Sequence, residues 1–357
     1  GDVYKRQLRS GAARENAMKI IVDAFGGDYA PKEVVFGALD ALQAKKSLHV
    51  VLVGDKPRIN ELLEGQTYDV TRLEVVHAPE VITNDDSPTA AVKTKKDSSI
   101  VKGLELLASD PDALGFVSAG ATGAVLVGAY MKLGRIKGVS RPALAPALPT
   151  LKGKPVILCD CGANVDCKPL NLLHFAIMAS AFSCAVTDAV KPVVGLLSNG
   201  AEDKKGNELN REAFELLKNS PYIDFKGNCE ARDLLSGDFD VVVADGFNGN
   251  IALKSAEGTA GAIFSILMDG VKKGGLRAKL GALLLKPVLK EVKTKMDYNS
   301  QGGACFLGVN KVVVKAHGAS KRKSVCASIL QARKLAKSGV VEKIRASVQA
   351  SDEQTGD

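Results

Sequence analysis

Five short loops of the chain combine glycine with side chains that can bind an anion or donate a hydrogen bond. Each loop follows an apolar run and contains Asp, Asn or Thr beside its glycines. Such residues are common in ordinary turns, because they tolerate positive φ angles and bond their own backbone. Together, however, the five loops predict one shared cleft, since ligands of parallel α/β sheets gather at the carboxyl ends of the strands. The loops are residues 23–28, 118–123, 160–166, 199–207 and 245–250.

The loop at 118–123 indicates a phosphate site. It reads SAGATG, and from Ala124 it continues into an apolar run that fits helical spacing. The first N–H groups of a helix have no partner within the helix, and the helix dipole is positive at that end. A glycine-rich turn that opens onto a helix is therefore typical of phosphate binding.

Four basic side chains near these loops could take part in chemistry. Lys204 and Lys205 lie in the polar loop NGAEDKKGNE, and Lys254 falls one turn into the next predicted helix. A lysine in a cleft can neutralise phosphate or stabilise an oxyanion, although lysines in charged runs are usually solvated. His317 follows the strand expected at Val312–Lys315 and could protonate a leaving group, or it could be structural.

The chain lacks the motifs of several other chemistries. The nucleophile motif G-x-S-x-G is missing, and no cysteine has an evident histidine partner, so a covalent acyl-enzyme is not indicated. The dinucleotide pattern G-x-G-x-x-G and the Walker pattern are also missing. Cys159, Cys161 and Cys167 lack zinc spacing and fit buried thiols in a reducing, intracellular setting. We therefore expect no metal and no cofactor.

The elements that would position these groups alternate between strand and helix. A helix is expected at residues 33–46, and the strands are each followed by small polar residues and then a helix. This succession predicts an α/β fold with three layers, a mostly parallel sheet covered by helices on both faces, of the Rossmann-like class. The expected strands are Met18–Asp23, 49–53, Ala113–Ser118, 155–160, 192–197 and 240–244.

The domain organisation follows from composition. Residues 1–17 are polar and unlike the rest, so we interpret them as a non-native or disordered leader. Residues 18–348 are expected to form a single α/β domain with a helical protrusion around 262–297, and residues 349–357 a disordered tail.

Residues 271–296 combine positive charge with apolar side chains. This segment has eight Lys or Arg residues and one acid, within a chain of net charge +8. Few aromatic residues accompany the charges, so nucleic acid is not the expected partner. The triplet Leu283, Leu284 and Leu285 is flanked by lysines, and Pro287 is expected to break regular helix there. We predict contact with an anionic membrane surface; a core or dimer helix is the alternative.

Ten motifs occur in an order that resembles the phosphate acyltransferase (PlsX) family of bacterial phospholipid synthesis. The resemblance extends from Met18 to about Val348 and, more distantly, to the phosphotransacetylase and isocitrate dehydrogenase structural class. The motifs are VDAFGGDYAP, KKDSSI, SAGATGA, RPALAP, DCGANVD, EDKKGNE, GNCEARDLL, DGFNGNIALKSAEG, GGACFLGV and KAHGAS.

The resemblance implies an activity and a set of partners. The family transfers a long-chain fatty acyl group from acyl carrier protein to inorganic phosphate, which gives acyl-phosphate for phosphatidic acid synthesis. A cytoplasmic homodimer that touches the membrane peripherally, and a downstream glycerol-3-phosphate acyltransferase, are also implied. Phosphate is itself a nucleophile, so the enzyme needs only to bind it, aim it at the thioester and support the oxyanion.

The resemblance also assigns roles to individual residues. Lys205 and Asn250 would form the catalytic pair, with Lys205 on phosphate or the oxyanion and Asn250 on the thioester oxygen, and His317 is a weaker candidate for protonating the thiolate. Ala121 stands where the family usually has Asn, and Ala319 where it usually has Ser, so any family role of those two side chains is absent here, while the backbone N–H groups remain. The residues expected to bind phosphate or substrate are Ser118, Gly120, Thr122, Gly123, Asn164, Lys204, Asp245, Asn248 and Lys254.

Three other functions remain open from the sequence. The first keeps the fold and uses acyl-CoA as the donor, as a phosphotransacetylase does. The second is a metal-dependent hydroxyacid dehydrogenase, for which the chain shows neither clustered metal carboxylates nor a clear nicotinamide site. The third is a non-catalytic membrane scaffold, whose role would survive mutation of the cleft.

Overall fold

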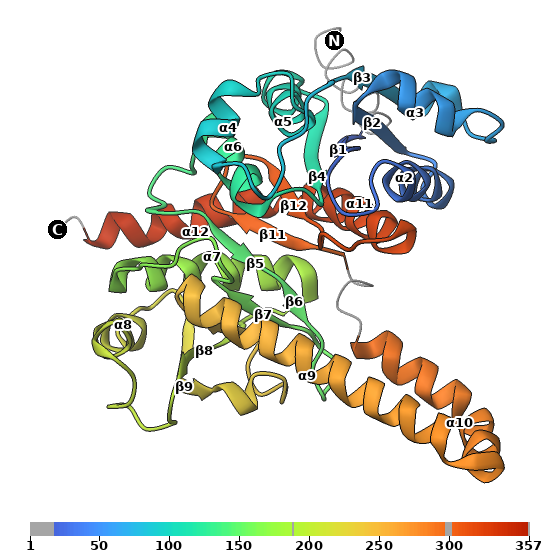
Figure 1. Ribbon diagram of the computed structural model, residues 1–357. Coiled ribbons are helices and arrows are strands. Elements are labelled where there is room, and N and C mark those ends of the chain that lie inside the picture. The colour runs from blue at the N-terminus through green and yellow to red at the C-terminus, as the bar shows by residue number, and fades with distance from the viewer. Residues whose placement is uncertain (1–17, 188, 297–301, 356–357) are drawn as a thin grey trace, which may run out of the picture.

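The strands of the chain form two sheets, one above the other in Figure 1. The computed structural model describes residues 18–187, 189–296 and 302–355. The leader expected at 1–17 lies outside these residues. The sequence predicted one sheet. The chain instead passes from one sheet to the other at Pro146, between β5 (Ala143–Ala145) and β6 (Ala147–Leu148).

The first sheet has seven strands in the order β3-β2-β1-β4-β12-β11-β5. Neighbours from β3 to β12 pair in parallel, whereas β11 is antiparallel to both β12 and β5. Strands β4 and β12 have the bounds that the sequence predicted. Besides β5, the members are β3 (Leu73–His77), β2 (Leu48–Gly54), β1 (Met18–Asp23), β4 (Ala113–Ser118), β12 (Val312–Lys315) and β11 (Ala304–Leu307).

The second sheet has five strands in the order β6-β7-β10-β8-β9. Strand β6 pairs antiparallel with β7, and the other neighbours are parallel. The carboxyl ends of β7, β8 and β10 therefore lie at one edge of this sheet. Besides β6, the members are β7 (Val156–Cys159), β10 (Val241–Val243), β8 (Val193–Ser198) and β9 (Asp224–Glu230).

Helices cover both faces of the sheets, so the fold belongs to the α/β, Rossmann-like class. On β1, Ile20 and Val22 belong to one buried cluster and Ile21 to another, as the two-residue period of a strand with two covered faces requires. The first cluster continues into the second sheet through Ile157 and Val241, so the sheets share apolar packing. The covering helices are α2 (Lys32–Ala44), α3 (Lys56–Leu63), α4 (Pro88–Thr94), α5 (Ser99–Ser109), α6 (Thr122–Leu133), α7 (Pro169–Thr187), α8 (Glu208–Lys218), α11 (Arg322–Lys337) and α12 (Val340–Thr355), with short 3-10 turns η1 (Val70–Arg72) and η2 (Ala231–Asp233).

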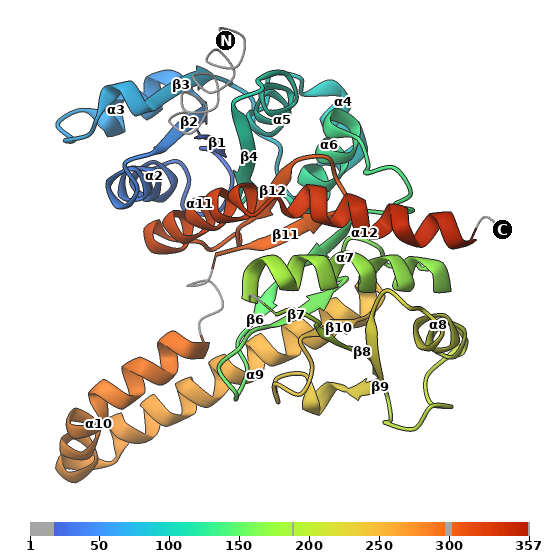
Figure 2. The ribbon, with the colours of Figure 1, turned by 180° about the vertical axis from the view of Figure 1, so that it is seen from behind.

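Two long helices form a hairpin that extends away from both sheets (Figures 1 and 2). They are α9 (Gly246–Lys273) and α10 (Gly275–Met296), and Gly275 takes a positive φ of 68° at the bend. By length and composition, α7 and α9 could each cross a membrane. Of the apolar 18-residue window in each helix, 78% is buried in α7 and 0% is buried in α9. The hairpin thus leaves a long apolar surface uncovered.

Two expectations about the C-terminal half are wrong. Pro287 does not break α10, which continues through it; a proline removes one N–H bond, and the rest of the ladder survives. Residues 349–355 are not a disordered tail but the last turns of α12, because Ser351 is buried and the Tyr222 hydroxyl donates to the carbonyl oxygen of Ala350. Residues 356–357 lie outside the described part of the chain.

Candidate active site

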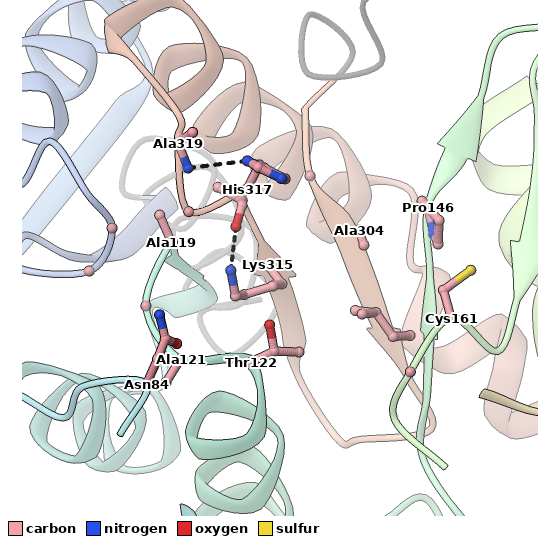
Figure 3. Close-up of a pocket in the computed structure, with 18 of the residues that line it drawn as sticks. Asn84, Ala119, Ala121, Thr122, Pro146, Cys161, Ala304, Lys315, His317 and Ala319 are labelled. Carbon is pink, nitrogen blue, oxygen red and sulfur yellow. Dashed lines mark hydrogen bonds between the residues drawn. The ribbon is translucent and has the colours of Figure 1, made fainter. Parts of the chain in front are cut away.

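A cavity of about 660 Å³ opens where the two sheets meet. The loops at 23–28, 118–123, 160–166 and 245–250 each contribute to its lining, and the loop at 199–207 does not. In Figure 3, Lys315, His317 and Thr122 lie on one side, while Pro146 and Cys161 lie on the other. Polar groups thus line one side, and apolar side chains line part of the other, so the cavity can take a ligand or pair of ligands of mixed character.

The glycine-rich loop after β4 is anchored by a buried carboxylate. The Ser118 hydroxyl donates to Asp23 Oδ2 (2.7 Å) and accepts from the N–H of Gly120 (3.0 Å), while the N–H of Phe25 donates to Asp23 Oδ1 (3.1 Å). Burial raises the pKa of Asp23, and the hydrogen bond from Ser118 partly offsets this. Ser118 is 1% exposed and does not line the cavity. It holds the loops after β1 and β4 together.

Helix α6 points its N-terminus at the cavity. Ala121 is its N-cap residue and provides no side-chain hydrogen bond, so the first-turn N–H groups have no side-chain cap. Ala121 and Thr122 line the cavity. Gly123 does not, because a Cβ there would lie 2.7 Å from the ring of Pro88. The helix packs so closely at Gly123 that only its preceding residues face the open space.

Two residues beyond β12, the His317 ring is held in one tautomer. Its Nδ1 accepts from the N–H of Ala319 (3.1 Å), so the neutral ring carries its proton on Nε2. Burial and then the charge of Lys254 lower the pKa of His317, so the neutral form dominates at pH 7. His317 lines the cavity as a neutral hydrogen-bond donor.

Helix α9 begins at a side-chain cap and turns polar residues toward the cavity. Asp245 accepts from the N–H (2.9 Å) and the side-chain amide (2.6 Å) of Asn248. Asn250 and Lys254 follow on the cavity side, and the Lys254 ammonium pairs with Glu257 at 3.0 Å. Asp245 and Asn248 therefore fix the helix start, whereas Asn250 and Lys254 are the groups that a ligand could touch.

The loop after β7 packs against the start of α9. Asp160 Oδ2 accepts from the N–H of Asn164 (2.6 Å), and the Asn164 carbonyl accepts from the N–H of Gly246 (2.7 Å). Gly249 lies so close that a Cβ on it would come within 1.9 Å of the Asp160 carbonyl oxygen. Asn164 is buried in this framework and does not line the cavity.

Lys204 and Lys205 are exposed and lie outside the cavity lining. Their loop follows β8, whose neighbour β10 leads into α9, so the loop shares an edge of the sheet with Asn250. The Asn228 side chain holds the loop through the carbonyl oxygen of Glu202 (2.7 Å).

The cavity thus brings together five of the residues singled out in the sequence, and it adds one that sequence reasoning missed. Lys315, the last residue of β12, is 8% exposed and lines the polar wall. A charged residue that ends an apolar strand was the available signal. The five are Gly120, Thr122, Asn250, Lys254 and His317.

The arrangement suits the binding of an anion beside an apolar group. The polar wall offers a buried ammonium, a helix N-terminus and a neutral imidazole donor, and the facing side offers the Asn250 amide. Within the described residues, no cluster of three or more His, Cys, Asp or Glu side chains could hold a metal ion.

Comparisons with known proteins give a consistent result. The model of the fatty acid synthesis protein family matches residues 18–343. The chain is 47% identical over 332 residues to the phosphate acyltransferase of Bacillus subtilis, covering 93% of this chain and 98% of that protein. It is 46% identical over 328 residues to the phosphate acyltransferase of Clostridium tetani, covering 92% and 97%.

Solved structures resemble the fold. A phosphotransacetylase from Streptococcus pyogenes superposes with a TM-score of 0.61 at 19% identity, covering 92% of this chain and 98% of that one. A branched-chain phosphotransacylase from Enterococcus faecalis gives a TM-score of 0.55 at 13% identity, covering 89% and 99%.

Proposed function

The chain belongs to the phosphate acyltransferase family, and we propose that it transfers a long-chain fatty acyl group from the thioester of acyl carrier protein to inorganic phosphate. The observation that carries the proposal is a cavity with a buried ammonium and a helix N-terminus on one wall and apolar side chains on the other. The polar wall suits phosphate, and the apolar wall suits the acyl chain.

The reaction is a direct displacement at the thioester carbonyl. A phosphate oxygen attacks the carbonyl carbon, the C–S bond breaks, and the thiolate leaves with a proton taken up from the site. The Asn250 amide donates to the carbonyl oxygen as it becomes an oxyanion, and Lys254 adds positive charge beside it. The Nε2–H of the neutral His317 ring donates a hydrogen bond to the leaving sulfur, and the proton that the thiolate takes up comes from the hydrogenphosphate nucleophile. Lys205 closes on the oxyanion or the phosphate from the neighbouring loop.

The carrier protein docks on a basic rim. Carrier proteins of this kind are acidic, so complementary charge speeds their association and gives it specificity. Two basic patches could form this rim, one at residues 321–323 and one on α10. Residues 321–323 lie beside the cavity-lining loop at 317–319, which shortens the path of the thioester. Lys321 lies over the ring of Tyr29 at 5.1 Å, and Arg322 is paired with Asp40 at 2.6 Å, so the former remains the more available cation. The other patch, Arg277 and Lys279, lies on α10.

The hairpin makes peripheral contact with anionic membrane and delivers the product there. Leu283, Leu284 and Leu285 are 63%, 75% and 55% exposed, beside the basic residues of α10. Burying three leucines contributes at most about 5–9 kcal/mol, which permits reversible surface binding. Acyl-phosphate is an amphiphile, so the surface suits transfer to a downstream membrane-bound glycerol-3-phosphate acyltransferase. The homodimeric, cytoplasmic state of the enzyme is part of the proposal and follows from the resemblance to the family.

The test of the proposed function compares two donors. Purified protein is mixed with phosphate and either palmitoyl-carrier protein or palmitoyl-CoA, and acyl-phosphate is trapped with hydroxylamine. The proposal expects product with the carrier protein and much less with CoA. Preference for CoA would support the phosphotransacetylase-like alternative, and no acyl-phosphate from either donor would contradict acyl transfer.

A further inference from the structure

Lys315 places a charged amine in the wall of the cavity with almost no access to water. It ends the strand VVVK, of which every residue is buried, and it pairs in register with Ser118 of β4. Among the described residues, its ammonium has one hydrogen bond, to the carbonyl oxygen of Ala316, and takes part in none of the ion pairs. Lys254, by contrast, already has Glu257 as a partner. Lys315 is therefore a buried cation without a counter-charge in contact.

Such an arrangement is unfavourable unless something compensates it. Lysine is among the residues least often buried, because removing an ammonium from water costs several kcal/mol without a paired anion. Burial lowers the pKa of Lys315 to about 8, and the charge of Lys254 acts in the same direction, while Asp23 and Asp28 oppose it. The Asp23 oxygens are already engaged by Ser118 and by the N–H of Phe25. Among the residues that the structure describes, no carboxylate thus forms an ion pair with Lys315.

A second, independent feature of the same wall also calls for an anion. Helix α6 has 12 residues, and its uncapped N-terminus at Ala121 and Thr122 faces the cavity. Figure 3 shows Lys315 between His317 and Thr122, with the Thr122 hydroxyl on the side of the lysine. An ammonium and the positive end of a helix dipole on the same side of one cavity form a site for a compact, doubly charged oxyanion.

We propose that the Lys315 ammonium and the first turn of α6 together hold the phosphate nucleophile. The proposal rests on the proposed function, in which phosphate is the acyl acceptor, and adds where that phosphate lies and which side chain binds it. Phosphate sits against the seven-stranded sheet, and the thioester carbonyl approaches from Asn250 on α9. The reacting groups then meet across the cavity, and Lys205 is left to act on the carbonyl side.

Lys315→Met tests the proposal, because methionine fills a similar volume without charge. Lys311→Met is the matched control: Lys311 precedes the same strand, and its ammonium likewise donates to a carbonyl oxygen, that of Ala113 (3.0 Å), but away from the cavity. Loss of a hydrogen bond to a charged group predicts a KM for inorganic phosphate raised roughly 10- to 150-fold in Lys315→Met. The KM for the acyl donor should change less than about twofold, and the rise in melting temperature on adding inorganic phosphate should disappear. Lys315→Arg should restore part of the phosphate affinity.

Three outcomes would overturn the assignment while leaving acyl transfer intact. The first is an unchanged KM for phosphate in Lys315→Met. The second is an effect confined to the KM for the acyl donor, which would place the donor's own phosphate group at Lys315. The third is an equal effect of Lys311→Met on the KM for phosphate. If neither donor yields acyl-phosphate with the unmodified enzyme, the proposed function itself has failed.

The unmodified enzyme offers a second test that does not depend on folding of a variant. The KM for phosphate should rise above about pH 8, as Lys315 loses its proton. The other titratable groups that line this space are Asp28, Cys161, Lys254, Glu257 and His317, and the buried Asp23 also acts on Lys315. The pKa of His317 lies below its usual 6.5, so His317 does not titrate in this range. Lys254→Met removes a charge that lowers the pKa of Lys315, so the rise should persist in that variant but move to higher pH. A KM for phosphate that stays flat from pH 8 to 10 would contradict the proposal.

Discussion

Replacing Lys315 with methionine should make the phosphate-free protein more stable at pH 7. The pKa of Lys315 falls from 10.5 to about 8 on folding. Between those values the unfolded chain binds the proton and the folded chain does not, so the free energy of unfolding rises with pH across this window. Below pH 8 the full penalty applies, about 3 kcal/mol at 1.36 kcal/mol per pKa unit.

Methionine removes this penalty and also the hydrogen bond to Ala316, which contributes about 1 kcal/mol. The net gain of about 2 kcal/mol corresponds to a rise in melting temperature of about 3 °C for a chain of this length. At pH 10 the gain should vanish, because the lysine is then neutral in the folded state and still mostly protonated in the unfolded one. The remaining penalty is below about 1 kcal/mol and no longer exceeds the hydrogen bond that methionine loses.

The assay is thermal unfolding in phosphate-free buffer at pH 7 and pH 10, with Lys311→Met as the control. Saturating phosphate should reverse the order at pH 7, since only the unmodified protein gains stability from binding it. If Lys315→Met is less stable than the unmodified protein at pH 7 without phosphate, the ammonium is already compensated within the protein. Lys315 would then need no anion at this point.

Four further predictions address the catalytic loop, the start of α9, the carrier and the membrane. Lys205→Ala should lower turnover by about two orders of magnitude in the hydroxylamine assay, with Lys204→Ala less affected; near-normal turnover would remove Lys205 from the mechanism. Gly249→Ala should greatly reduce thermal stability, because its Cβ would come within 1.9 Å of a backbone oxygen. Gly261→Ala on the same helix meets nothing within 4 Å and should raise stability by about 0.5–1 kcal/mol. Equal effects of the two substitutions would refute the close packing at Gly249. The KM for acyl carrier protein should rise steeply with salt, and a flat dependence would argue against a basic docking rim. The protein should pellet with anionic vesicles, and Leu284→Glu should release it while soluble acyl transfer persists; aggregation or loss of the dimer would make that leucine an interface residue.

The strands that are continuous or nearly continuous apolar runs were predictable, whereas β9 (Asp224–Glu230), which carries several polar residues, was not. Met18–Asp23 and Val312–Lys315 match their expected bounds for this reason. The division into two sheets was not predictable, because β5 and β6 have three and two residues and only Pro146 separates them. Strands that short carry no periodic signal, and Ala145 of β5 pairs with Cys305 of β11, which lies 160 residues later in the sequence.

The site was predictable as a set of loops but not as a set of contacts. Ser118 was expected on a ligand, yet its hydroxyl bonds Asp23, which lies 95 residues earlier. Lys315 escaped notice because a lysine at the end of an apolar strand looks the same in sequence whether it faces water or a cavity. What buries it is the neighbouring strand β4, paired with it from about 200 residues away.

The cavity lies where the two sheets meet, and this position bears on how the reaction is controlled. Phosphate would be held by β12 and α6 of one sheet, and the thioester by α9, which springs from the other. Neither wall alone brings nucleophile and carbonyl together. The wall that carries α9 is also the base of the exposed hairpin. A membrane or a second subunit that binds the hairpin therefore acts on α9, the helix that positions Asn250. Lys315, by contrast, lies on β12, an interior strand of the seven-stranded sheet. Changes at the hairpin should accordingly alter the handling of the acyl donor before they alter the affinity for phosphate.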